Sequence, residues 1–303
     1  MKKIRIAVVG FGNIGPAVVD AALAAPDMEI AGVVLRDRTK AAEKGVVGLP
    51  VAEDISELGA VDVVMLCTPS PDMPDLAAKF LHLGINTVDS YDIHSDLYDM
   101  QCKIAEGARS GSAVAVIGAG WDPGTDSMVR GILEAAAPRG MTHTNFGPGM
   151  SMGHTSAVKA IPGVRKALSM TIPLGSGIHR RMVYVEVLDG FDFETVRESI
   201  KNDPYFIKDE THVFLVDDID ALQDRGHGVN MIRRGVSGQT DNQFFEFNMR
   251  INNPALTAQV MVAAGRATIR LRERKIFGCY TMLEIPIIDL LPGDREGIIR
   301  RLV

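Results

Sequence analysis

The stretch that decides the fold is IRIAVVGFGNIGP, residues 4–16. Its first half is almost entirely apolar, which is typical of a strand buried on both faces of a parallel sheet. Its second half places Gly10, Gly12 and Gly15 in the spacing G-x-G-x-x-G, and the alanine- and valine-rich residues 16–25 predict a helix directly afterwards. In this setting the first glycine permits a tight turn, the second lets the backbone approach a pyrophosphate, and the third lets the helix pack on the strand. The stretch therefore predicts a dinucleotide-binding turn at a helix N-terminus.

Composition narrows the class of protein. The chain has 303 residues, enough for two domains, with 46% apolar and 23% charged residues, as in ordinary soluble proteins. A formal net charge of −6 disfavours nucleic acid or an anionic membrane as partner and leaves a small-molecule substrate open. Scattered cysteines at 67, 102 and 279 predict neither disulfides nor a metal site, and no apolar run approaches the ~20 residues that span a bilayer. We expect a soluble, cytoplasmic protein.

Strands and helices alternate through the first third of the chain. This alternation predicts a Rossmann-type, doubly wound parallel sheet of the α/β class, in which ligands bind at the carboxyl ends of the strands. The expected strands after the first lie at residues 29–35, 61–67, 85–88 and 113–117, and the expected helices at residues 73–83 and 96–110.

Arg36-Asp37-Arg38 follows the second expected strand, where such a fold contacts the adenosine ribose. An acidic residue there pairs with the 2′-hydroxyl of NAD, whereas arginine suits the 2′-phosphate of NADP. Asp37 could be salt-bridged by its neighbours, so the triplet favours NADP and leaves NAD open. Together with the other strand ends, the predicted cofactor-binding residues are Gly10, Gly12, Asn13, Ile14, Gly15, Arg36, Asp37, Arg38, Cys67, Thr68, Ser70, Tyr91, Asp92 and His94.

Two carboxylates, Asp92 and Asp122, follow the strands at residues 85–88 and 113–117. Facing one cleft, they could bind a substrate ammonium, and one could accept a proton from water attacking an imine. For Asp122, just before Pro123 at a helix start, capping of that helix is an equally good interpretation.

The pattern changes after Pro123. A helix is expected at residues 126–137, and then strands with longer alternation at residues 182–188, 213–216 and 244–251, which predict a second, mostly antiparallel α+β domain. Asn253-Pro254 opens a long helix, to about Arg274, that we expect to pack back against the first domain. The predicted division is a dinucleotide-binding domain at 1–122, completed by 254–303, and a substrate-binding and dimerisation domain at 123–253.

Further polar candidates lie in this second domain. The glycine-rich loop at residues 147–153 leads through His154 into a helix and could bind a carboxylate through its N–H groups. Arg180-Arg181 opens a strand, and alternation lets only one of the two arginines point into a cleft. His227, between glycines, is more typical of a loop histidine than of a ligand.

The sequence resembles the meso-diaminopimelate dehydrogenase family from end to end. The resemblance rests on VVGFGNIG (8–15), VDSYDIH (88–94), GWDPG (120–124), FGPGMSMGHTSAVKAIPGV (146–164), TIP (171–173), HRR (179–181) and NNP (252–254). It implies NADP-dependent oxidative deamination of the D-centre of meso-diaminopimelate, in lysine biosynthesis, by a homodimeric enzyme.

The resemblance also assigns roles to individual residues. Asp92 and Asp122 match the acids that hold the D-centre amine beside the nicotinamide, and Met152 and Gly153 match the backbone positions that bind the nearby carboxylate. Thr171, Arg181 and His227 match the polar cluster around the distal carboxylate. The substrate-binding residues that it implies are Trp121, Phe146, Met152, Gly153, His154, Thr171, Arg181, His227 and Asn253.

The chain departs from the family pattern in several places. Phe146 replaces the tryptophan before GPG, Met152 replaces the glutamine before GH, and Leu35-Arg36-Asp37 replaces Ser-Arg-Arg. The segment between Pro173 and His179 is short, as in one branch of the family with broader D-amino-acid tolerance. Alternative hypotheses are therefore a dehydrogenase of another diamino or D-amino acid, and a nicotinamide-sensing regulator without catalysis.

Overall fold

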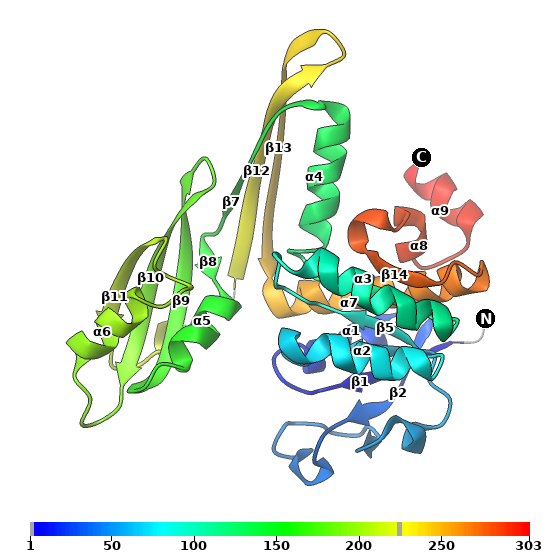
Figure 1. Cartoon of the computed structure of the whole chain (residues 1–303), viewed down its shortest axis with the longest axis horizontal. Coiled ribbons are helices and arrows are strands. Elements are labelled where there is room, and N and C mark those ends of the chain that lie inside the picture. The colour runs from blue at the N-terminus through cyan, green and yellow to red at the C-terminus, as the bar shows by residue number, and fades with distance from the viewer. Residues whose placement is uncertain (1–2, 223–225) are drawn as a thin grey trace. The chain divides into compact units, whose positions relative to one another are not determined.

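The computed structural model describes residues 3–222 and 226–303. The chain divides into two compact units, Met1–Gly131 with Pro254–Val303, and Ile132–Asn253 (Figure 1), called here the first and the second unit. Within the described residues, no helix is both long and apolar enough to cross a membrane.

The first unit is built on a seven-stranded parallel sheet with strand order β14-β6-β5-β4-β1-β2-β3. β1 lies between β2 and β4, so the order reverses at β1 and opens the crevice typical of nucleotide-binding folds. The Rossmann-type sheet is thus confirmed. Its strands are β1 Ile4–Val9, β2 Met28–Val34, β3 Val51–Ala52, β4 Val63–Leu66, β5 Asn86–Asp89, β6 Val114–Ile117 and β14 Gly278–Thr281.

The helices of the first unit cover both faces of this sheet. They are α1 Gly15–Ala24, α2 Met73–His82, α3 Leu97–Ser110, the start of α4 Thr125–Ala136, α7 Asn253–Glu273, α8 Ile287–Leu290 and α9 Arg295–Leu302. Because side chains alternate along β1, Ile6 and Val8 pack with α1 and α7, while Ala7 packs with α2 and α3. α7 contributes Met261, fully buried, to the first of these layers. α7 therefore packs on the sheet of the first unit.

β14 is an element that the sequence pattern did not predict. It is four residues long, GCYT, and pairs in parallel with β6 at the edge of the sheet. A segment this short, with a glycine and mixed polarity, carries no period-2 signal, so only its pairing with β6 makes it a strand.

The second unit holds two sheets, with strand orders β11-β10-β9-β8 and β13-β12-β7. All pairings are antiparallel except that of β10 with β11, which confirms the mostly antiparallel prediction. The elements are β7 Arg139–Phe146, β8 Gly149–Met150, α5 Met152–Lys159, β9 Val164–Gly175, β10 Ile178–Val187, α6 Phe193–Lys201, β11 Glu210–Leu215, β12 Gly226–Ser237 and β13 Thr240–Asn252.

The two sheets of the second unit differ in how well they are covered. The four-stranded sheet packs a compact apolar core with α5 and α6, including Val183, Ile200 and Phe206, each at most 1% exposed. In the three-stranded sheet, no residue of β13 is buried, although Phe245, Phe247 and Met249 alternate along it. This unit therefore has one closed core and one sheet that its own chain covers incompletely.

Candidate functional site

The glycine-rich turn between β1 and α1 has the geometry that its three glycines predict. Gly10 has φ +88°, and a Cβ there would lie 2.7 Å from the carbonyl oxygen of Cys67. A Cβ on Gly15 would lie 2.7 Å from the carbonyl oxygen of Gly10, which shows how closely helix and strand pack. A Cβ on Gly12 would meet no atom within 4 Å, and no side chain caps the first turn of α1. The turn therefore leaves open space beside a helix N-terminus, as a pyrophosphate requires.

A cavity of about 380 Å³ adjoins this turn. Gly12, Cys67 and Thr68 line it on the side of the glycine turn, and Arg36 and Asp37 line it at the end of β2. These five residues come from three neighbouring strand ends, which the fold brings to one edge of the sheet. The structure thus brings five of the fourteen predicted cofactor-binding residues to one cavity.

The charged triplet after β2 differs from the expectation. The prediction that Asp37 pairs with its arginine neighbours is wrong. Asp37 instead accepts hydrogen bonds from Thr39, from its backbone N–H at 3.0 Å and from its side-chain hydroxyl at 2.5 Å. These bonds cap the short 3₁₀ helix Arg38–Lys40 and lower the pKa of Asp37. Arg36 pairs with Asp72, Nη2 to Oδ2, at 2.7 Å.

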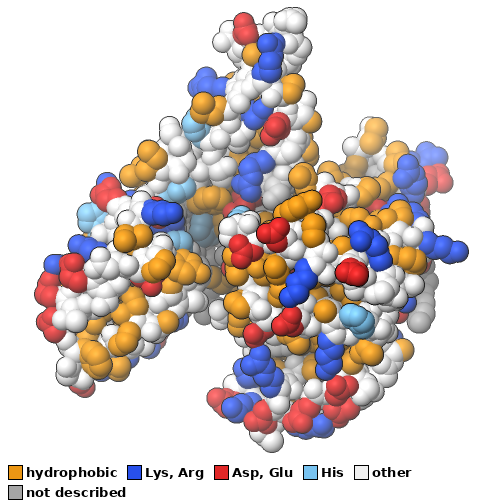
Figure 2. All heavy atoms as spheres, viewed as in Figure 1, with side chains coloured by type: hydrophobic (Ala, Val, Ile, Leu, Met, Phe, Trp, Pro, Cys, Tyr) orange, Lys and Arg blue, Asp and Glu red, His pale blue; other side chains and the backbone are white. Residues whose placement is uncertain are grey.

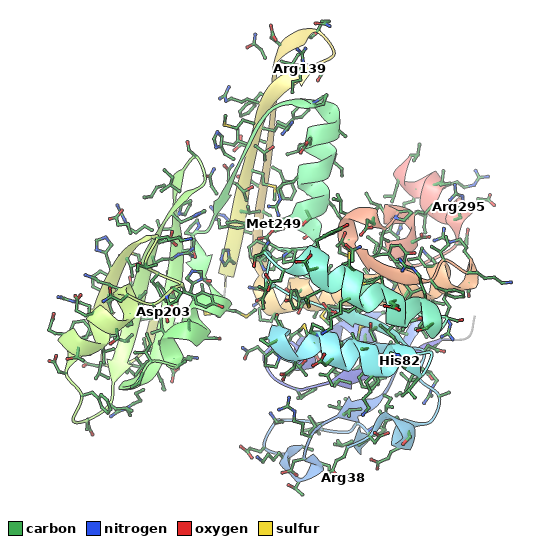
Figure 3. The ribbon with its side chains drawn as sticks, viewed as in Figure 1. Arg38, His82, Arg139, Asp203, Met249 and Arg295 are labelled. Carbon is green, nitrogen blue, oxygen red and sulfur yellow. The ribbon has the colours of Figure 1, made fainter. Side chains whose placement is uncertain are left out.

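Arg38 does not line the cavity. Its guanidinium pairs with Glu57 at 2.9 Å and lies near Glu53, at 3.6 Å. Figure 2 shows acidic and basic side chains crowded over the part of the first unit where Figure 3 labels Arg38. The cavity is lined instead by Lys40 and Lys44, which sequence reasoning missed. Their spacing of four residues just after Asp37 was the available signal.

Two acidic residues follow neighbouring strands of the first unit. Asp92 comes after β5 and accepts a hydrogen bond from the hydroxyl of Ser70 at 2.6 Å. Asp122 comes after β6 and accepts one from Nη2 of Arg130 at 2.5 Å, while its other oxygen lies 3.7 Å from Nε2 of His94. Because β5 and β6 are adjacent and His94 belongs to the loop of Asp92, the two loops meet at this point.

Asp126 lies one turn beyond Asp122, in the first turn of α4. Its side chain is fully buried, and neither carboxyl oxygen has a hydrogen-bond partner. Burial, followed by the charge of Asp122, raises its pKa to about 7. Sequence reasoning missed this residue because an acid in a first helical turn is usually exposed.

Asp89, the last residue of β5, is the other buried acid of this region. It accepts hydrogen bonds from the backbone N–H groups of Tyr91, at 3.0 Å, and Gly118, at 3.1 Å, so it ties the ends of two strands together. Burial raises its pKa to about 6. Tyr91 itself is 3% exposed and packs in the apolar layer beneath the sheet.

The two arginines that open β10 lie on opposite faces of its sheet. Arg180 pairs with Glu210 on the more exposed face. Arg181, whose side chain is 13% exposed, donates from Nη1 to the hydroxyl of Thr171 and from Nε to Oδ2 of Asp209 at 2.6 Å. Only one of the two arginines therefore points inward, as alternation along a strand predicts.

Two histidines of the second unit lie close enough to Arg181 for its charge to lower their pKa values. His154 meets the hydroxyl of Ser151 at 2.8 Å through Nδ1, and burial, followed by the charge of Arg181, lowers its pKa to about 4. Nε2 of His179 accepts a hydrogen bond from the backbone N–H of Phe146 at 2.8 Å, and the same two causes lower its pKa. Both imidazoles are therefore neutral at pH 7.

The remaining predicted substrate residues are placed as follows. Met152 and Gly153 begin α5, and a Cβ on Gly153 would meet no atom within 4 Å. His227 lies in strand β12, not in a loop; it is 6% exposed and accepts a hydrogen bond from the N–H of Gly228 at 2.8 Å. Trp121 and Asn253 are 8% and 7% exposed.

The structure thus assembles an acidic cluster around Asp92 and Asp122 in the first unit. In the second unit it assembles a cluster of polar side chains around Arg181, called here the arginine cluster. Sequence reasoning missed the ion-pair partners in both, Arg130 and Asp209, because pairing over 8 and 28 residues leaves no local pattern. Among the described residues, no group of histidine, cysteine and acidic side chains could hold a metal ion.

Comparisons with known proteins agree with this geometry. A family model described as the diaminopimelic acid dehydrogenase C-terminal domain matches residues 120–253, and one for an oxidoreductase family with an NAD-binding Rossmann fold matches residues 4–89. The chain is 58% identical over 303 residues to a meso-diaminopimelate D-dehydrogenase of Bacteroides fragilis, with 100% of both chains covered. It is 32% identical over 323 residues to one from Corynebacterium glutamicum, with 99% of both covered.

Two solved structures have the same fold, and each match covers 100% of this chain and 100% of the matched chain. The C. glutamicum diaminopimelate dehydrogenase in complex with DAP has a TM-score of 0.90 at 32% identity. An engineered D-amino acid dehydrogenase bound to NADP+ has a TM-score of 0.86 at 30% identity. With a relative 58% identical over its full length, the chain belongs to the meso-diaminopimelate D-dehydrogenase family.

Proposed function

We propose that the protein catalyses the NADP-dependent, reversible oxidative deamination of the D-centre of meso-2,6-diaminopimelate, giving L-2-amino-6-oxopimelate and ammonia for lysine biosynthesis. The observation that carries this proposal is the pair of carboxylates, Asp92 and Asp122, after adjacent strands of a nucleotide-binding sheet. Their loops meet at His94, so both acids belong to one acidic cluster. An acidic cluster beside a nicotinamide suits a substrate that reacts at a carbon bearing an ammonium group.

The open turn at Gly12 and the adjoining cavity fit a dinucleotide. We assign the pyrophosphate to the N–H groups of the turn, including Asn13 and Ile14, and the ribose to the end of β2. Arg36, Lys40 and Lys44 line the cavity there, and three cations against Asp37 and Asp72 favour a 2′-phosphate. Bound NADP supplies the acceptor for the hydride.

At the reacting carbon, the carboxylates orient the ammonium and handle protons. Asp92 is held by Ser70, and Asp122 is held by Arg130, so each keeps a defined position. Loss of a proton leaves the amine neutral before the hydride departs. One of the two carboxylates then accepts a proton from the water that attacks the imine, and we assign this to Asp122.

At the other end of the substrate, we assign the distal carboxylate to Arg181 and Thr171. These two residues are already hydrogen-bonded to each other, which fixes the guanidinium plane. The open N-terminus of α5, at Met152 and Gly153, suits the carboxylate of the D-centre. We further assign substrate contacts to Trp121, Phe146, His154, His227 and Asn253.

Two other functions remain to be separated by experiment. A dehydrogenase of another D-amino acid would need the acidic cluster but not Arg181. A nicotinamide-sensing regulator would need neither. NADPH formation should be followed at alkaline pH with meso-diaminopimelate, D-lysine, 2,4-diaminopentanoate and D-alanine as substrates. We expect meso-diaminopimelate to have the highest kcat/KM; a higher value for another amine supports the first alternative, and no NADPH with any of them supports the regulator.

We also propose that the protein is a cytoplasmic homodimer that associates through the three-stranded sheet. Met141 of β7 and Phe244 of β13 are 62% and 47% exposed, and their strands pair with β12 on either side. Light scattering coupled to gel filtration should give twice the chain mass. Replacing Met141 and Phe244 by aspartate should yield monomers, whereas aspartate at Leu215, 54% exposed on β11, should not.

A further inference from the structure

Asp209 lies beside the arginine that we assign to the distal carboxylate of the substrate. We propose that Asp209 is a positioning residue that sets substrate selectivity: it holds Arg181 by the Nε edge and cancels its charge, so that the distal pocket is neutral. Such a pocket accepts a distal carboxylate without demanding one. This inference rests on the distal-site assignment made above.

The hydrogen-bond geometry leaves Arg181 able to bind a ligand. A guanidinium has five N–H donors in a planar fork. Nε–H of Arg181 donates to Asp209, and one Nη1–H donates to Thr171. Up to three donors remain at the Nη end of the fork, where a carboxylate can bind with two parallel hydrogen bonds. Asp209 therefore orients the guanidinium without occupying the edge that a substrate needs.

The charges around Arg181 explain the neutrality of the pocket. The side chains of Arg181 and Asp209 are 13% and 26% exposed, so solvent screens their attraction only partly. The lowered pKa values of His154 and His179 keep both imidazoles uncharged at pH 7. Of these four groups only the ion pair is charged, and its two charges sum to zero. The further charge that acts on His154, that of Asp203, is negative, so it does not restore a positive potential to the pocket.

A matched pair on the other face of the same sheet isolates this effect. Arg180 pairs with Glu210 at 2.9 Å, one residue along from Arg181 and Asp209, but on the more exposed face. Glu210→Gln removes the same charge as Asp209→Asn at nearly the same place in the chain. It is therefore the control for any general effect of charge on the second unit.

The experiment compares kcat/KM for meso-diaminopimelate with kcat/KM for D-norleucine, which has no distal carboxylate. Asp209→Asn keeps a hydrogen-bond acceptor for Nε and removes the charge. We expect the ratio of the two kcat/KM values to rise about tenfold, because one negative charge near the distal carboxylate is gone. The rise should come from a lower KM for meso-diaminopimelate, with kcat unchanged. Asp209→Glu should restore a ratio close to that of wild type, and Glu210→Gln should leave it unchanged.

An unchanged or lower ratio in Asp209→Asn overturns the inference, because Asp209 is then only an anchor for Arg181. Circular dichroism checks the fold, and Asp209→Ser serves as the second neutral variant if Asp209→Asn does not fold. Arg181→Ala distinguishes this failure from that of the distal-site assignment. If Arg181→Ala lowers the ratio, the assignment stands whatever Asp209→Asn does; if it leaves the ratio unchanged, the assignment itself fails.

Discussion

In both the acidic cluster of the first unit and the arginine cluster of the second, an ion pair holds a charged side chain in place. The two clusters differ in net charge. In the first, Arg130 neutralises only one of the carboxylates, and Asp92 is held by a neutral hydroxyl. In the second, Arg181 and Asp209 cancel and the histidines are neutral. The net charge of each cluster therefore depends on ion-pair partners that are distant in the sequence. We expect an enzyme strict about the amine at one end of its substrate and tolerant at the other.

The largest effect should come from the acidic cluster. Asp122→Asn keeps the shape of the side chain and removes its basicity, so kcat for meso-diaminopimelate should fall by about 10²–10⁴-fold. Affinity for NADP, measured by calorimetry, should stay unchanged because Asp122 does not line the nucleotide cavity. Asp92→Asn should act similarly. Asp99→Asn, in the exposed first turn of α3, is the control. A near wild-type kcat in Asp122→Asn would make that carboxylate a structural partner of Arg130 and not the base.

The second prediction tests the arginine cluster, which we assign to the distal carboxylate of the substrate. Arg181→Ala should raise KM for meso-diaminopimelate about 10- to 100-fold, because charge-assisted hydrogen bonds to the distal carboxylate are lost. D-Alanine, without that carboxylate, should be affected little. Arg180→Ala, on the opposite face of β10, should change neither value. Equal losses with both substrates, in a variant folded by circular dichroism, would remove the contrast between the two clusters.

The third prediction concerns the cation count in the nucleotide cavity. Replacing Lys40 and Lys44 by alanine should raise the Kd for NADP about tenfold more than that for NAD, since only NADP carries the 2′-phosphate. Arg36→Ala should also discriminate between the cofactors. Arg38→Ala should not, because its guanidinium is engaged by Glu57 outside the cavity. Parallel losses for both cofactors in the lysine variant would show that the lysines do not bind the phosphate.

The smallest effect should be the pH dependence of stability that Asp126 causes. Its folded-state pKa, about 7, is above the ordinary 3.8, so its contribution to stability is present below about pH 4 and is lost as pH rises through 7. Asp126→Asn removes that loss. Its Tm relative to wild type should therefore be about 2–6 °C more favourable at pH 8.5 than at pH 5. A difference in Tm that does not vary with pH would show that Asp126 does not titrate in this range.

Local patterns in the sequence predicted most of the first unit and the positions of Asp92 and Asp122 after adjacent strands. The glycine turn, the strands and Asp92 and Asp122 follow from short segments whose period or spacing is self-contained. β14 could not be predicted, because four residues of mixed polarity become a strand only beside β6. Long-range partners such as Asp209 were beyond prediction for a similar reason. The resemblance to a family supplied Thr171, which no local pattern singled out, and chose Arg181 over Arg180, a choice that alternation alone left open.

The position of the long helix α7 late in the chain affects how the protein folds during synthesis. Its Met261 and Ala264 are fully buried against residues such as Val18 and Met65, which lie near the N-terminus. A ribosome has therefore synthesised all of the second unit before it releases the helix that completes the first. Until then, the nascent nucleotide-binding layer exposes an apolar face, the kind of surface that chaperones bind. A chain truncated at residue 253 should be captured by them, whereas the intact chain buries that face with its own last fifty residues.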